Sequence, residues 1–141
     1  MAKIFWDTNL FIYLLEHNRD WSARVIELRR RMLARGDQLL TSYLSIGEVL
    51  TKPNEMKDSI LEKSNIKFFS SNVIQLIRFD VEAAQWYAEI GSRERIRPAD
   101  AIQLACASAA GTDLFVTSDA RLCDLVAPGI TFITGIARIP Y

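Results

Sequence analysis

The sequence predicts an α/β fold built on a buried parallel sheet. Short apolar segments with strand propensity alternate with longer segments whose apolar residues recur at helical spacing. Several of the predicted strands are continuously apolar, which is typical of parallel strands covered on both faces. The chain has 141 residues, half of them apolar, so we expect a single domain with one well-filled interior.

The first half of the chain contains alternating strands and helices. A glycine, Gly36, is expected to end the second helix, and Pro53 is expected to end the third. The predicted strands are Lys3–Trp6, Gln38–Thr41 and Asn72–Ile77, and the predicted helices are Thr8–Glu16, Asp20–Arg35, Ser42–Thr51 and Asn54–Asn65.

The second half continues the alternation. Asp80 is placed to cap a helix that runs to about Glu94. Pro98 favours the start of another helix, which runs to Ala110. Two further strands are predicted, Leu114–Thr117 and Ile130–Ile133.

Composition excludes several classes of protein. The 17 basic and 17 acidic residues cancel, and no charged tail suggests nonspecific DNA binding. The apolar runs are much shorter than the ~20 residues of a membrane span, and MAKIFWD lacks the apolar region of a signal peptide. Cys106 and Cys123 show no metal-binding spacing. We therefore expect a protein of the reducing cytoplasm without a membrane partner.

Four acidic residues fall where a parallel sheet would bring them together. Asp7 follows the first strand and Asp119 follows the strand Leu114–Thr117. Glu48 lies in the helix after the second strand, and Asp100 lies in the first turn of a later helix. Because sites in such sheets form beyond the carboxyl ends of the strands, we expect these carboxylates to converge.

A cluster of carboxylates predicts a cation. Carboxylates close together raise one another's pKa unless positive charge lies between them, and oxygen ligands suit Mg²⁺ or Mn²⁺. Such an ion activates water and offsets the negative charge of a phosphate. The cluster therefore predicts metal-dependent phosphodiester hydrolysis, which needs no base from His17, the single histidine.

Each acid taken alone also has a structural explanation. Asp7 is placed to cap the helix that follows it, and Glu48 is placed to pair with Lys52. Asp100 complements a helix dipole, and Asp119 suits a turn or a helix N-cap. These alternatives remain open residue by residue, but the joint placement of the four acids favours a site.

Four segments together resemble the PIN-domain ribonucleases, many of which are VapC-type toxins of type II toxin–antitoxin pairs. The segments are FWDTNLFIYLLE, SIGEVL, RPADAIQLACA and LFVTSDARL, in that order. The resemblance extends from Lys3 to about Ile133. It implies a three-layer α/β/α sandwich with a mostly parallel sheet of four to five strands, as one domain over residues 1–141. It also implies RNA as substrate, a cognate antitoxin as partner and a homodimer.

The resemblance also assigns the site. It implies one or two Mg²⁺ or Mn²⁺ ions held by the four acids, with a supporting amide and a supporting hydroxyl nearby. The segment TSDARL departs from many toxins, which have an asparagine before the acid and an aromatic residue after it. The residues carried over are Asp7, Glu48, Asp100 and Asp119 as metal ligands and catalytic residues, with Asn9 and Thr117 in support.

Arginines are the predicted contacts to RNA. Without the four acids, 17 basic residues face 13 acidic ones, a remainder of +4. Guanidinium groups suit bidentate phosphate contacts. Arg93, Arg95 and Arg97 precede the Asp100 helix and are therefore predicted to bind RNA phosphate, with a solvated loop paired to Glu94 as the alternative.

Other functions fit less well. Haloacid-dehalogenase-type phosphatases need a second aspartate where this chain has Asn9, and receiver domains need a lysine that ITFITGIARIP lacks. A PIN nuclease that processes RNA without being a toxin remains open. A PIN-like module that binds RNA or protein without cleavage also remains open, although the presence of all four acids argues against it.

Overall fold

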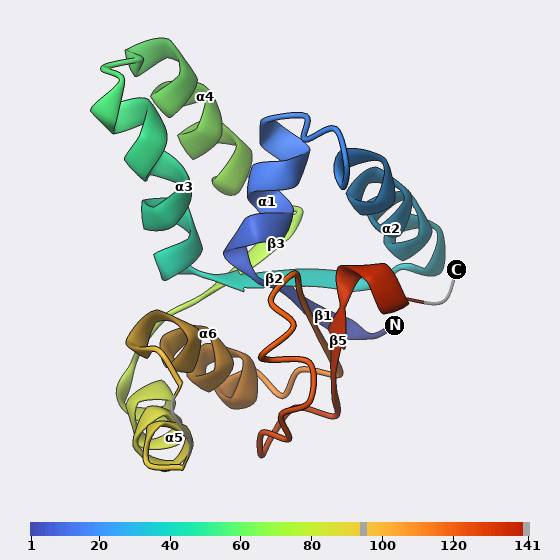
Figure 1. Cartoon of the computed structure of the whole chain (residues 1–141), viewed down its shortest axis with the longest axis vertical. Coiled ribbons are helices and arrows are strands. Elements are labelled where there is room, and N and C mark those ends of the chain that lie inside the picture. The colour runs from blue at the N-terminus through green and yellow to red at the C-terminus, as the bar shows by residue number, and fades with distance from the viewer. Residues whose placement is uncertain (94–95, 140–141) are drawn as a thin grey trace.

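A parallel sheet forms the centre of the computed structural model, which describes residues 1–93 and 96–139 (Figure 1). Within these residues the sheet has five strands in the order β3-β2-β1-β4-β5, and every neighbouring pair is parallel. The α/β prediction is therefore confirmed. The strands are β1 (Lys3–Trp6), β2 (Gln38–Ser42), β3 (Ile74–Ile77), β4 (Leu114–Thr117) and β5 (Phe132–Gly135).

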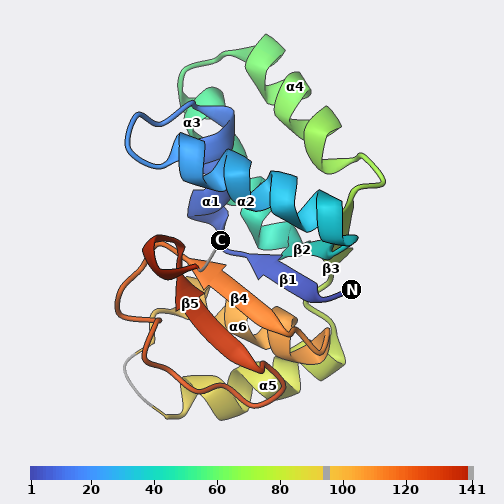
Figure 2. The same cartoon turned by 90° about the vertical axis from the view of Figure 1, so that its right-hand side faces the viewer.

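Helices cover both faces of the sheet, as Figures 1 and 2 show. One layer contains α1 to α4 and the other contains α5 and α6. No helix in the described part of the chain is both long and apolar enough to cross a bilayer. The helices are α1 (Thr8–Leu15), α2 (Ser22–Arg35), α3 (Tyr43–Glu55), α4 (Ser59–Phe69), α5 (Val81–Gly91) and α6 (Pro98–Ala109), with a short 3₁₀ helix, η1 (Ile136–Arg138), after β5.

The layers follow from the handedness of parallel crossovers. From β1 the chain steps outward to β2 and β3, so right-handed connections place α1 to α4 on one face. From β3 it returns past β1 to β4 and continues outward in the other direction. The same handedness then places α5 and α6 on the opposite face.

Each face of the sheet packs its own apolar core. In β1, Ile4 and Trp6 belong to the core under α1 to α4, whereas Phe5 belongs to the core under α5 and α6. Phe5 stacks on Phe115 of β4 with ring centroids 5.2 Å apart. Both faces of the strand are thus buried, which explains why the strand is apolar without interruption.

The boundary between α3 and α4 differs from the prediction. Helix α3 continues through Pro53 to Glu55 instead of ending at Thr51. Proline is disfavoured inside helices because it lacks an N–H and crowds the preceding turn, but only two residues of α3 follow Pro53, so little of the helix lies beyond the turn that it disturbs. Helix α4 begins only after Asp58, whose carboxylate accepts the backbone N–H of Leu61 at 3.0 Å.

Two smaller differences between the predicted and the observed elements lie in the second half of the chain. Strand β5 begins at Phe132, opposite Leu114, whereas the predicted strand began at Ile130. A turn bond from the N–H of Ile130 to the carbonyl of Ala127 holds that residue outside the sheet. Helix α5 ends at Gly91, and its predicted end, Glu94, lies outside the described residues.

The order of the strands places a crevice between β1 and β4. The connection after β1 leads toward β2, and the chain beyond β4 leads toward β5, so the chain leaves the two strands in opposite directions. Such a switch point is where ligands bind in open parallel sheets. Asp7 and Asp119 follow these two strands directly.

Candidate active site

The four predicted acids line a single pocket at the carboxyl edge of the sheet. The pocket has a volume of about 580 Å³, and Asn9, Arg97 and Gln103 line it as well. Asp7, Glu48, Asp100 and Asp119 reach it from separate segments of the chain. The predicted convergence of the acids is therefore confirmed, and their roles remain predictions.

Asp7 is the most enclosed of the acids. It lies between β1 and α1, and only 8% of its surface is exposed. One carboxylate oxygen accepts the backbone N–H of Thr8 and the other accepts the hydroxyl of Thr117, both at 2.8 Å. Asp7 is thus also the N-cap of α1, so the structural alternative is confirmed, and the metal-binding role stays a prediction.

Burial sets the charge state of Asp7. Loss of solvent raises the pKa of its carboxyl from 3.8 to about 6, although the hydrogen bonds from Thr117 and Thr8 act in the opposite direction. The neighbouring carboxylates of Asp100 and Glu48 raise this pKa further. The ionised form is therefore costly here unless a cation lies close by.

Glu48 is held by a hydroxyl group. Its Oε1 accepts the hydroxyl of Thr8 at 2.6 Å, which links the first turn of α1 to the middle of α3. Lys52, the alternative partner, instead donates to Glu16 at 2.8 Å. The Glu48 carboxylate therefore faces the pocket without a bond to that lysine.

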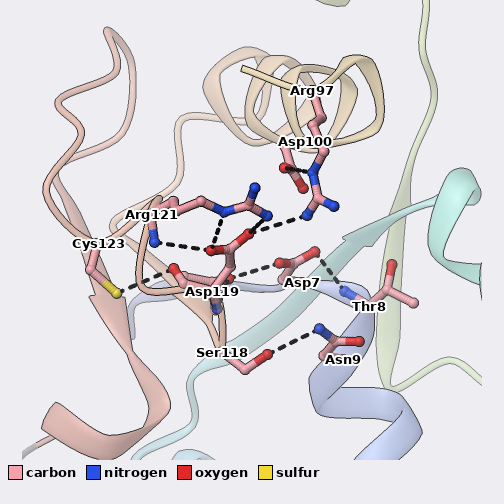
Figure 3. Close-up of polar contacts among 10 residues, drawn as sticks. Asp7, Thr8, Asn9, Arg97, Asp100, Ser118, Asp119, Arg121 and Cys123 are labelled. Carbon is pink, nitrogen blue, oxygen red and sulfur yellow. Dashed lines mark hydrogen bonds and ion pairs between the residues drawn. The ribbon is translucent and has the colours of Figure 1, made fainter. Parts of the chain in front are cut away.

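Two arginines pair with the other two acids, as Figure 3 shows. The guanidinium of Arg97 spans Asp100 and Asp119, with nitrogen–oxygen distances of 3.2 and 3.3 Å. Arg121 contacts both carboxylate oxygens of Asp119, at 2.7 and 3.1 Å. The bonds from Arg121 hold the pKa of Asp119 below its usual value, and the charge of Arg97 adds to this effect.

Asn9 and Thr117 connect the two sides of the crevice. Besides donating to Asp7, the buried Thr117 hydroxyl accepts the backbone N–H of Asp119 at 3.0 Å. The Asn9 side-chain amide donates to the Ser118 hydroxyl at 3.0 Å (Figure 3). Both predicted supporting residues therefore lie at the site.

Two of the predicted RNA-binding arginines, Arg97 and Arg93, lie at different pockets. Arg97 lines the acidic pocket. Arg93 pairs with Glu89 at 2.9 Å and lines a different pocket beside Val126, so the structure does not bring it to the acids. Arg95 lies outside the described residues, as does Glu94, its alternative partner.

The sequence analysis missed a set of polar residues under the pocket, and it missed Arg121. The set consists of Thr8, Thr41, Ser42, Ser45 and Gln103, all buried. A signal for Gln103 exists: it is the one long polar side chain in the small and apolar stretch Ala101–Ala107 of α6, one turn after Asp100. The signal for Arg121 is its place two residues after Asp119 in a strand-end turn.

The donors at the site suit a hard divalent cation. All four acids offer oxygen, the ligand that Mg²⁺ and Mn²⁺ prefer. Within residues 1–93 and 96–139, no three Asp, Glu, His or Cys side chains are gathered closely enough to hold an ion as they stand. Arg97 bridges two of the acids, so binding of an ion requires this guanidinium to give way.

Comparison with known proteins agrees with the fold. A family model of the PIN domain matches residues 4–127. A search of curated proteins finds no significant match.

Several solved structures share the fold. VapBC2 from Rickettsia felis, bound to a promoter DNA fragment, aligns with a TM-score of 0.71 and 16% identity, over 94% of this chain and 97% of that chain. DNA-bound VapBC from Salmonella typhimurium has a TM-score of 0.69 and 18% identity, covering 96% and 99%. VapC20 from Mycobacterium tuberculosis, a toxin that cleaves the sarcin–ricin loop, has a TM-score of 0.66 and 17% identity, covering 88% and 97%.

Proposed function

The chain belongs to the PIN domain family, and from this premise we propose that it is a Mg²⁺- or Mn²⁺-dependent endoribonuclease that acts as the toxin of a type II toxin–antitoxin pair. One observation carries the proposal. Four carboxylates from separate segments line one pocket at the switch point of the sheet. Carboxylates gathered in this way repel one another unless positive charge lies between them, and the ion pairs of Arg97 and Arg121 are made with Asp100 and Asp119, not with Asp7 or Glu48.

We expect the four acids to contact the ion in different ways. Asp7, Glu48 and Asp100 would hold it directly, and Asp119 would hold it directly or through water. The bound ion supplies an activated water and offsets negative charge on the scissile phosphate. Thr117 and Thr8 keep the Asp7 carboxylate in place through the two bonds at 2.8 Å, so this ligand is oriented before the ion arrives.

The arginines would contact the RNA. Arg97 and Arg121 are exposed on more than half of their side-chain surface and lie at the acids. Once a cation takes over the carboxylates, their guanidinium groups are available for bidentate contact with a phosphate. Arg93 and Arg95 remain predicted contacts of a longer RNA.

The structural neighbours support the toxin assignment. Two of them, from Rickettsia felis and Salmonella typhimurium, are VapBC structures, and they resemble this chain over nearly their whole length. By analogy, this protein would act in the cytoplasm, bind a cognate antitoxin and form a homodimer.

The test is RNA cleavage by the purified protein. A panel of structured and single-stranded RNAs is incubated with Mg²⁺, with Mn²⁺ or with chelator, using wild type, Asp7→Asn and Asp100→Asn. The exposed Asp20, mutated to asparagine, is the matched control. We expect metal-dependent cleavage by wild type and Asp20→Asn and none by the two site variants, with all four folded by circular dichroism.

Two results would contradict the proposal. Cleavage that persists in both site variants would identify a contaminating nuclease. Absence of both cleavage and Mn²⁺ binding in wild type would indicate a module that binds without catalysis.

A further inference from the structure

We propose that Gln103 is a positioning residue that fixes Glu48 in the acidic site through the hydroxyl of Thr8. The inference rests on the proposed metal-dependent nuclease and extends it to residues that are not expected to touch metal or RNA. Gln103 lies on α6 one turn after Asp100, and only 1% of its surface is exposed.

The side-chain amide of Gln103 is fully used in hydrogen bonds. Its nitrogen donates to the hydroxyl oxygens of Thr8 at 3.0 Å and Ser45 at 2.8 Å. Its oxygen accepts the hydroxyl of Ser42 at 2.6 Å. All these partners are buried, so water does not compete for the bonds and their loss is expensive.

The direction of each hydrogen bond in this network follows from the backbone carbonyl of Trp6, which can only accept. Thr41 donates to the backbone carbonyl of Trp6 at 2.9 Å, so its oxygen receives the hydrogen of Ser45, 2.7 Å away. Ser45 has then used its only hydrogen and must accept from another donor. Two donors lie beside it, the amide nitrogen of Gln103 at 2.8 Å and the hydroxyl of Thr8 at 3.2 Å. The nearer donor is Gln103, and this contact sets the orientation of the amide.

The orientation of the amide determines what Thr8 can do. Thr8 accepts from Gln103, and its single hydrogen goes to Glu48 Oε1, a charged acceptor at 2.6 Å, in preference to the Ser45 hydroxyl oxygen at 3.2 Å. With the amide reversed, Gln103 would present an acceptor to Thr8 and compete with Glu48 for that hydrogen. Gln103 thus holds Glu48 through one intervening hydroxyl and leaves the other carboxylate oxygen of Glu48 for a cation.

The same amide joins the elements that carry three of the acids. It bonds α6, which carries Asp100, to Thr8 at the start of α1, next to Asp7. It also bonds α6 to Ser45 near the start of α3, which carries Glu48. These donors are neutral, so they set the spacing of the carboxylates without cancelling their charge. Removing such partners of metal ligands typically lowers metal affinity by roughly 10–100-fold.

The test is a double-mutant cycle read by Mn²⁺ affinity. Isothermal titration calorimetry compares wild type, Gln103→Met, Thr8→Val and the double variant, with folding checked by circular dichroism. Gln85→Met, on the exposed side of α5, is the matched control, and Thr8→Ser restores the hydroxyl.

We expect the single variants Gln103→Met and Thr8→Val each to lose about tenfold in Mn²⁺ affinity. The double variant should lose little more, because both substitutions break the same chain of hydrogen bonds. Thr8→Ser and Gln85→Met should bind as wild type does.

Three outcomes separate the alternatives. Wild-type affinity in folded Gln103→Met, or additive losses in the double variant, would overturn the role of Gln103. If Gln103→Met does not fold, the comparison of Thr8→Val with Thr8→Ser decides, and equal affinity in that pair would overturn the role. If wild type and Gln85→Met bind no Mn²⁺, the proposed function itself fails, which differs from a selective loss in the variants.

Discussion

The two sides of the acidic pocket hold their carboxylates in different ways. On one side, Asp7 and Glu48 accept hydrogen bonds from hydroxyl and backbone N–H groups. On the other side, Asp100 and Asp119 pair with the guanidinium groups of Arg97 and Arg121. Neutral donors orient a carboxylate and leave its charge in place, whereas a guanidinium cancels the charge.

The pKa values of Asp7 and Asp119 also differ between the two sides. Burial raises the pKa of Asp7 to about 6, whereas the bonds from Arg121 lower the pKa of Asp119. Two aspartates that follow neighbouring strands thus shift in opposite directions. The unbalanced negative charge is on the Asp7 side, which is where we expect a cation to bind first.

The largest expected effect is on stability as a function of pH. The folded protein holds the proton of Asp7 more tightly than the unfolded chain does, because its pKa rises from 3.8 to about 6. The contribution of Asp7 to stability should therefore be greatest below about pH 4 and fall by about 3 kcal/mol as pH rises through about 6. Asp7→Asn should lack this loss. Urea unfolding of both proteins without metal, between about pH 4 and pH 7, measures the difference.

The other side of the pocket does not interfere with this measurement. The pKa of Asp119 is lowered, so the stability from its ion pairs is present above its unfolded value and is lost only at more acid pH. Equal pH dependence in wild type and Asp7→Asn would show that Asp7 is not strained by its burial. Saturating Mn²⁺ should also stabilise wild type more than the variant at about pH 7.

A smaller effect is expected from Thr117→Val. The substitution keeps the shape of the side chain and removes the hydroxyl that donates to Asp7 and accepts from the backbone of Asp119. The loss should raise the pKa of Asp7 further and cost about 1–3 kcal/mol of unfolding free energy near pH 7. Thr117→Ser keeps the hydroxyl and should stay close to wild type. Equal stability of the valine and serine variants would contradict the account.

The smallest effect concerns the arginine side. Removing the guanidinium in Arg97→Gln leaves Asp100 and Asp119 without one competitor for a cation. Since exposed ion pairs contribute about 0.2–1 kcal/mol, Mn²⁺ affinity should rise roughly 1.4- to 5-fold. Arg93→Gln, which breaks a pair with Glu89 away from the pocket, is the matched control. Equal binding by Arg97→Gln in calorimetry would show that the arginine does not compete with the ion, and weaker binding would show that it orients the carboxylates for the ion.

The ends of strands could be predicted where an apolar segment is followed directly by polar residues. The apolar segments of β1 and β4 end at Asp7 and at Thr117-Ser-Asp, and the structure has the predicted bounds of both strands. The end of α3 was not predictable in this way, because proline is a general helix breaker that the last turn nevertheless tolerates. The better signal was Asp58, a cap for the next helix.

The acids of the site were predictable for the same reason, and their neutral partners were not. A carboxylate at the end of an apolar strand is conspicuous, whereas a threonine or glutamine is common in any segment. Gln103 and Thr8 are 95 residues apart in the chain, and only the folded sheet brings them together. The arginine at position 121 was visible in LFVTSDARL, but its pairing depends on the turn after β4.

The most direct test of the account is crystallography with Mn²⁺, using anomalous scattering to locate the ion. We expect an anomalous peak at the Asp7–Glu48 side of the pocket, within coordination distance of Asp7, Glu48 and Asp100, with the Arg97 guanidinium moved off Asp100. A peak bound to Asp119 alone, or no peak in this pocket at a saturating Mn²⁺ concentration, would contradict the claim that the acids with neutral partners form the metal site.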